Sequence, residues 1–326
     1  MAAGSNGQNL EPANAAGCLK FRGDGTFTIA QLTDVHYGGG IREDELSLTL
    51  IESAFAADRP DLAVFTGDLI RRGPDARAQF ARVTSTAAEA GIPYAFVFGN
   101  HDSRRDATRS ELMELEAGKP YCLSRAGPGD VSGVGNYTLE IGGSHDGRTA
   151  AMLYLFDSEC NAPQWAVSPD SGGKGEWIDR DKVVWYVGES AAFTLRNGSP
   201  LPSLAFFHIP LPEYEDVWRT GACSGNRFAK VRCPELNVGL FAAMIERGDV
   251  MGTFVGHDHS NDYCGELGGI RLCYGRVTGF NGDVGGDMQR GVRIIRLREG
   301  RRGFDTWIRQ ADGSVAASLP EHASQR

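Results

Sequence analysis

The chain has 326 residues, of which 41% are hydrophobic and 23% are charged, as in a globular protein with enough apolar side chains for a sizeable core. Its formal net charge is -9 and its Lys and Arg residues are dispersed, so the sequence lacks the basic stripe typical of proteins that bind nucleic acid or anionic membranes. No stretch approaches the roughly 20 consecutive apolar residues that a membrane-spanning helix needs.

The first hundred residues alternate between strand and helix patterns. We predict strands at residues 26–33, 62–66 and 94–98, with helices at 43–57 and 74–90 between them. Leu46, Leu50 and Ala54 repeat every fourth residue, which places them on one face of the first helix. This alternation favours parallel strands with helices packed on the sheet, an α/β fold.

The remaining elements are more varied. We predict an antiparallel pair at 136–141 and 150–156, helices at 179–195 and 235–247, strands at 203–207 and 250–255, a hairpin at 262–274, and last strands at 292–297 and 304–308. Residues 103–118 are partly helical in this prediction. Long loops at 161–176 and 210–234 remain, and because such loops are usually functional, we expect them to wall a site.

The two ends of the chain are small and polar. We predict tails at residues 1–22 and 311–326 around a single domain at 23–310. The start has neither the basic end nor the apolar centre of a secretory signal peptide.

The seven cysteines show no paired C-x-x-C zinc spacing. Cys264 and Cys273 flank a short turn, and Cys223 and Cys233 flank a polar loop. Each pair is either a disulfide or two isolated thiols. A Cys264–Cys273 disulfide would favour an oxidising compartment, so a secreted or periplasmic location.

Polar side chains follow five of the predicted strands at the point where each strand ends. Five of the seven histidines in the chain are among them. The complete set is Asp34, His36, Asp68, Asn100, His101, Asp102, His208, His257 and His259. Because ligands bind at the carboxyl ends of strands in open α/β sheets, we expect these side chains to converge.

The chemistry of this set indicates metal binding. It offers carboxylate, amide and imidazole donors without a thiolate, which suits Mn, Fe, Zn or similar ions. The donors are too many for one ion, whereas two divalent ions that share a bridging carboxylate would use them well. Two-metal sites hold their ions about 3.5–4 Å apart and clamp both the attacking and the leaving oxygen in phosphoryl transfer.

The order of the motifs, D-x-H, G-D, G-N-H-D, a lone H and G-H-x-H, resembles the calcineurin-like metallophosphoesterases. The segments at 206–214 and 256–267, with Gly-Asn-Tyr at 135–137 and Phe-Asp-Ser at 156–158, resemble the branch of small purple-acid-phosphatase-like proteins of plants and fungi. The likeness covers roughly residues 26 to 298. It implies a four-layer sandwich, in which two mixed β-sheets are flanked by helices.

The resemblance also assigns roles to residues of this chain. It implies two trios of ligands with a shared bridge: Asp34, His36 and His259 for the first ion, Asn100, His208 and His257 for the second, and Asp68 between them. It places His101 beside the leaving group, with Asp102 to orient it. Two positions depart from the pattern. Arg71 replaces the tyrosine that colours purple acid phosphatases, and Arg104 stands where the branch tends to have an acidic residue.

The implied activity is the hydrolysis of phosphate monoesters by a metal-activated hydroxide, with His101 assisting the leaving group. A phosphodiesterase on the same metal core is the alternative within the same class. A non-catalytic metal-binding scaffold is the alternative from another class, although the complete ligand set favours an enzyme.

Overall fold

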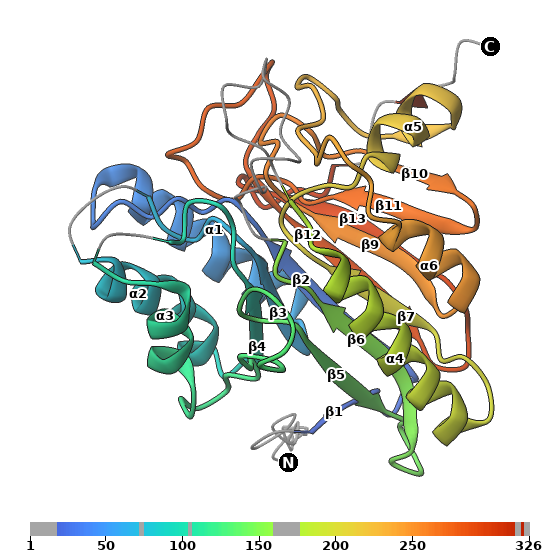
Figure 1. Cartoon of the computed structure of the whole chain (residues 1–326). Helices are drawn as coiled ribbons and strands as arrows, with labels where there is room; N and C mark the ends of the chain where they lie inside the picture. The colour runs from blue at the N-terminus through green and yellow to red at the C-terminus, as the bar shows by residue number, and fades with distance from the viewer. Residues whose placement is uncertain (1–17, 72–74, 104–105, 159–176, 317–320, 323–326) are drawn as a thin grey trace, which may run out of the picture.

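The computed structural model describes residues 18–71, 75–103, 106–158, 177–316 and 321–322. Two mixed β-sheets pack face to face, and helices cover the outer face of each (Figure 1). The predicted two-sheet α/β architecture is therefore confirmed.

The smaller sheet has five strands in the order β13-β12-β2-β3-β4. Its parallel part is built from β2 (Thr26–Leu32), β3 (Leu62–Thr66) and β4 (Tyr94–Val97). The helices α1 (Arg42–Asp58), α2 (Ala76–Glu89) and α3 (Arg109–Glu116) lie on one side of this sheet (Figure 1). The hairpin of β12 (Gly291–Arg298) and β13 (Phe304–Gln310) joins antiparallel to β2.

The larger sheet has nine strands in the order β1-β5-β6-β7-β9-β11-β10-β8-β14. At its centre β6 (Thr149–Leu155), β7 (Ser203–Phe206), β9 (Val250–Val255) and β11 (Ile270–Tyr274) are parallel neighbours. β5 (Tyr137–Gly142) and β10 (Cys264–Leu267) flank them in the antiparallel sense. The helices on this side are α4 (Arg180–Asn197), α5 (Glu213–Thr220) and α6 (Leu240–Arg247).

Three apolar cores hold these layers together. The central core joins the two sheets, and Val64 of the smaller sheet and Leu204 of the larger one are both fully buried in it. The outer cores lie between the smaller sheet and α1 and α2, and between the larger sheet and α4 and α6. Because the central strands are buried on both faces, they appear in the sequence as unbroken apolar runs.

The predicted tails end differently in the structure. β1 (Leu19–Lys20) pairs with β5, and Leu19 and Phe21 are buried, so the packed chain begins before residue 23. Near the other end, β14 (Glu321–His322) pairs with β8 (Cys223–Ser224), and the His322 ring stacks on Trp218 with 4.1 Å between ring centroids. Two-residue strands carry no periodicity that a sequence pattern could reveal.

Two further predictions need correction within the larger half. The loop expected at 210–234 contains the helix α5, and the helix expected from residue 235 begins only at Leu240. The loop expected at 161–176 lies outside the described residues.

One of the two cysteine pairs forms a disulfide, and the other does not. Cys264 and Cys273 form a disulfide at opposing positions of the β10–β11 hairpin, with Cα atoms 4.2 Å apart. Cys223 and Cys233 are free thiols. Among the described residues, no helix combines the length and apolar character needed to cross a membrane.

Candidate metal centre

The predicted site residues follow the carboxyl ends of strands from both sheets, and four of them have an unusual backbone. Asp34, His36, Asp68 and His257 adopt left-handed φ angles of 52°, 48°, 52° and 73°. Such conformations cost non-glycine residues on the order of 1–3 kcal/mol and concentrate at functional sites. The backbone N–H groups of Asp34 and His36 donate to the carbonyl oxygens of Gly67 and Asp68, which ties the first two strand ends together.

The glycines of the motifs allow the strand ends to approach closely. A Cβ atom at Gly99 would collide with Asp68, and one at Gly256 would collide with Thr33 and Asp34. The sequences G-N-H-D and G-H-x-H therefore need glycine because another strand end occupies the space of a side chain.

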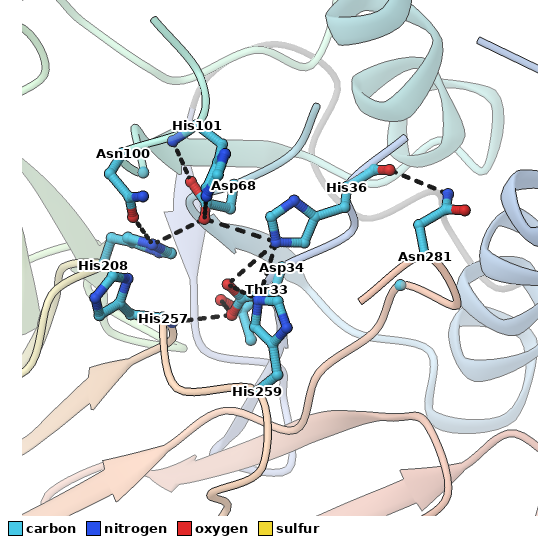
Figure 2. A network of polar contacts seen from close by, with 12 residues as sticks. Thr33, Asp34, His36, Asp68, Asn100, His101, His208, His257, His259 and Asn281 are labelled. Carbon is cyan, nitrogen blue, oxygen red and sulfur yellow. Dashed lines mark hydrogen bonds and ion pairs between the residues drawn. The ribbon is translucent and has the colours of Figure 1, made fainter. Parts of the chain in front are cut away.

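The first group of candidate ligands consists of Asp34, His36 and His259 (Figure 2). Asp34 Oδ1 lies 3.3 Å from His259 Nε2 and 3.8 Å from His36 Nε2. The Nε2 atoms of the two histidines are 3.0 Å apart. One carboxylate oxygen and two imidazole nitrogens thus face a common point.

The second group consists of Asp68, His208 and His257. Asp68 Oδ2 lies 3.3 Å from His208 Nε2 and also 3.7 Å from His36 Nε2 of the first group. Asn100 Oδ1 lies 3.1 Å from His208 Nε2. Asp68 therefore stands between the two groups, at the place that the resemblance gives to a bridging ligand (Figure 2).

In Asp34 and Asp68, hydrogen bonds from the protein hold one carboxylate oxygen and leave the other oxygen facing the site. Thr33 Oγ1 and the His257 N–H donate to Asp34 Oδ2, at 2.8 and 3.0 Å, which leaves Oδ1 toward the imidazoles. The His101 N–H donates to Asp68 Oδ1 at 2.7 Å, which leaves Oδ2 toward His208 and His36. His208 Nδ1 lies 2.8 Å from the Thr66 carbonyl oxygen, so Nε2 points into the group. This is how proteins orient metal-binding imidazoles, and the residues present fit divalent ions.

The electrostatics of the site keep both carboxylates ionised, and they also hold a proton on His208 that would have to leave when a cation binds there. Burial alone would raise the pKa of Asp34, but the neighbouring His259 holds it below its ordinary value. Burial likewise opposes ionisation of Asp68, yet His208 keeps the pKa of this carboxyl well below its usual range. Burial lowers the pKa of His36 to about 4, so its ring is neutral near pH 7. Burial also disfavours charge on His208, but Asp68 outweighs it and raises that pKa to about 10.

Asp102 has a different set of partners from the predicted one. Its buried carboxylate accepts hydrogen bonds from the backbone N–H groups of Asp68, Leu69, Ile70 and Gly99. These bonds clamp the Asp68 segment to the Gly99 turn. We therefore revise the role of Asp102 from orienting the His101 ring to positioning the backbone of the candidate bridge.

His101 lies at the entrance to the two groups. Its side chain is 43% exposed, and its Nε2 lies 4.0 Å from Asp68 Oδ2. Together with His36 and His259 it lines an open cleft of about 870 Å³. Ala229, Lys230 and Arg232 of the predicted 210–234 loop also line this cleft, as expected for a loop that walls a site. Arg104 lies outside the described residues.

Two residues outside the predicted motifs support His36, one directly and one through the other. Asn281 Nδ2 donates to the His36 carbonyl oxygen at 3.1 Å and to Asp44 Oδ1 at 2.5 Å (Figure 2). Asp44 is fully buried and also accepts from the N–H groups of Gly38 and Gly40, at 2.8 and 2.7 Å. Three consecutive glycines before an acidic residue in the first turn of a helix were a usable signal for Asp44. Asn281 offered none.

Fold and site together define a class, namely two-sheet α/β proteins with two adjoining groups of candidate metal ligands at the strand ends. The sequence model of the calcineurin-like phosphoesterases matches residues 27–261, and the chain belongs to this family.

The relatives of the chain are purple-acid-phosphatase-like proteins. It is 32% identical to "Probable inactive purple acid phosphatase 29" of Arabidopsis thaliana, over 90% of this chain and 85% of the plant protein. It is 30% identical to "Phosphatase DCR2" of Saccharomyces cerevisiae, over 88% of this chain but only 54% of the yeast protein. The solved purple acid phosphatase PPD1 from yellow lupin shares the fold, with a TM-score of 0.50 at 12% identity over 92% of this chain and 54% of the lupin chain.

Proposed function

We propose that this protein hydrolyses phosphate esters, foremost monoesters, at the two ligand groups. The observation that carries the proposal is the convergence of a complete donor set from five strand ends. Two carboxylates, one amide and four imidazoles are present: Asp34, Asp68, Asn100, His36, His208, His257 and His259. Some relatives are named probably inactive, and the full donor set is our reason to propose activity here.

In this proposal the first group holds one divalent ion and the second group, with Asn100, holds another, while Asp68 is shared. Mn, Fe or Zn would suit these oxygen and nitrogen donors. When bound, two such ions supply charge neutralisation for the phosphate group and an activated water for attack at phosphorus.

His101 is the residue that we propose as general acid. Its ring is half exposed in the cleft, and its backbone N–H is anchored to Asp68 Oδ1. The departing alcohol oxygen needs a proton, and an imidazole at the entrance can donate one from Nε2. Such assistance is typically worth about 10²–10⁴-fold in rate.

Cleavage of phosphodiesters is the second candidate. The cleft of about 870 Å³ is open, so it has room for a second ester substituent beside the two groups. The substrate preference therefore has to be measured on both ester types.

The test is a turnover panel on the full chain, reconstituted separately with Mn, Zn and Fe. 4-Nitrophenyl phosphate represents monoesters and bis(4-nitrophenyl) phosphate represents diesters. We expect metal-dependent turnover that is faster for the monoester and absent in Asp68→Ala. Faster diester turnover would favour the phosphodiesterase, and metal binding without turnover of either ester would favour the scaffold.

A further inference from the structure

The cleft that leads to the ligand groups is lined by more positive than negative charge. Arg71, Lys230 and Arg232 line it, with Asp283 as the acidic residue among the described lining side chains. None of the three cations belongs to either ligand group. A substrate can use those charges that are not already paired within the protein.

The guanidinium of Arg232 is already paired with other groups of the protein. Its Nε donates to Asp258 Oδ1 at 2.9 Å, and its NH2 group donates to the His257 carbonyl oxygen at 2.8 Å. Asp258 is buried, so this pair braces the turn that carries His257 and His259. Arg232 therefore has a structural partner for its charge.

Arg71 and Lys230 are different. Both side chains are exposed, and in the described part of the chain neither makes a hydrogen bond or ion pair through its charged group. Arg71 follows the Asp68 turn, where its backbone N–H donates to the Tyr37 carbonyl oxygen at 2.8 Å. Lys230 comes from the loop between β8 and α6. Two distant segments thus bring two available cations to one cleft.

The location of these cations indicates which part of a substrate they meet. The scissile phosphate belongs at the two ligand groups, where ions and imidazoles would neutralise it. His101, the proposed proton donor to the leaving alcohol, lines the same cleft as Arg71 and Lys230. The alcohol part of the ester therefore extends into the region that these two cations line.

We propose, building on the phosphoesterase function above, that the alcohol part of the preferred substrate carries its own anionic group, a second phosphate or a carboxylate. Arg71 and Lys230 bind this group. The guanidinium offers paired N–H donors that match phosphate and carboxylate oxygens, and the ammonium adds a point charge. The site then selects small phosphomonoesters that carry a second anionic group over those that carry only the scissile phosphate.

The test compares matched substrates that differ in the second group. Fructose 1,6-bisphosphate against fructose 6-phosphate reports on a second phosphate, and 3-phosphoglycerate against glycerol 3-phosphate reports on a carboxylate. The variants are Arg71→Gln and Lys230→Gln. The control is Arg148→Gln, which removes one exposed charge from the turn between β5 and β6, away from the residues that line the cleft.

We expect wild type to have the higher kcat/KM for the member with two anionic groups in at least one pair. Each cleft variant should reduce that preference about three- to tenfold, as expected for one lost charge-assisted contact in a solvated cleft, and the control should leave it unchanged. A second readout avoids turnover. The rise in Tm of the metal-loaded protein on adding pyrophosphate, relative to inorganic phosphate, should shrink in both cleft variants.

Different results would overturn the second anion site and the phosphoesterase function. If wild type hydrolyses 4-nitrophenyl phosphate but shows no preference in either pair, or if the cleft variants keep the preference, the second anion site is wrong while the phosphoesterase function stands. If wild type hydrolyses none of these esters with any metal, the function itself is wrong. Loss of the preference for bisphosphate alone would identify the group as phosphate, and loss for phosphoglycerate alone would identify it as carboxylate.

Discussion

The two ligand groups are built from similar side chains but in different surroundings. In the first group, the side chains of His36 and His259 are 7% and 22% exposed and line the cleft. In the second group, His208 is fully buried and His257 is 3% exposed. His208 is held by the Thr66 carbonyl at the end of β3. The His36 carbonyl oxygen instead accepts a hydrogen bond from Asn281, which also donates to Asp44 of helix α1, and both of these residues lie outside the strands. The second group is thus part of the core between strands, whereas His36 of the first group is supported from outside the strands, by helix α1 and by Asn281.

Because of this difference, a mutation near one group should weaken the binding of that group's ion more than that of the other. Asp68 is the exception, because it lies between the two groups. Asp68→Ala should abolish binding of both ions and reduce turnover to background, because its Oδ2 faces histidines of both groups. Metal analysis after dialysis, together with esterase assays, checks this. Asp312→Ala, on the exposed surface, is the control and should keep both ions. Full metal content in Asp68→Ala would refute the bridging role.

The role proposed for His101 predicts that catalysis and metal binding can be separated by mutation. His101→Ala should slow esters with poor leaving groups by about 10²–10⁴-fold, because the departing alkoxide loses its proton donor. Nitrophenyl esters should suffer less, since their leaving group needs little protonation. Metal content should stay near that of wild type. Equal slowing of both ester types, or loss of the ions, would show that His101 is not the general acid.

The support that the first group receives from outside the strands can be tested through Asp44 of helix α1. Asp44→Asn keeps the shape of the side chain but weakens its acceptance of the Gly38 and Gly40 N–H groups. We expect a loss of metal affinity of about 10–100-fold at one of the two ions, as is typical when residues behind metal ligands are changed. Titration calorimetry should then resolve one weakened and one unaltered binding event. Equal weakening of both events would contradict the contrast between the groups.

Of the changes considered, removal of the disulfide should affect the metal centre least. Replacing both Cys264 and Cys273 by Ser opens a loop with a sequence separation of nine residues, which the chain-entropy relation values at about 2–3 kcal/mol of unfolding free energy. Denaturant unfolding measures this loss, and both ions should still bind. A change in metal stoichiometry would mean that the hairpin shapes the site.

The ligands of both groups could be predicted because they follow apolar strands, whereas the residues that support His36 could not. That pattern is local, and glycine marks the turns beside Asp68, Asn100 and His257. The support of the first group is not local. Asn281 and His36 are 245 positions apart, and their contact passes through a side chain and a carbonyl oxygen that no periodicity reveals.

The elements that were predicted and those that were missed differ in length. The strand and helix alternation before residue 100 was readable because its helices are long and amphipathic. α5 has only eight residues between two loops, and β1 and β14 have two residues each. Their pairing depends on tertiary contacts such as the stacking of His322 on Trp218. The resemblance implies that Asp102 orients His101, whereas in the structure its carboxylate accepts hydrogen bonds from the backbone of a neighbouring strand end.

The central claim is that both groups hold ions and that these ions serve catalysis. The most direct measurement is metal content and 4-nitrophenyl phosphate turnover on one sample of the full chain, followed through removal by a chelator and restoration. The account predicts close to two divalent ions per chain, with turnover that disappears and returns with them. Two bound ions without turnover of any mono- or diester would contradict the catalytic role, and fewer than one ion per chain after reconstitution would contradict the metal centre itself.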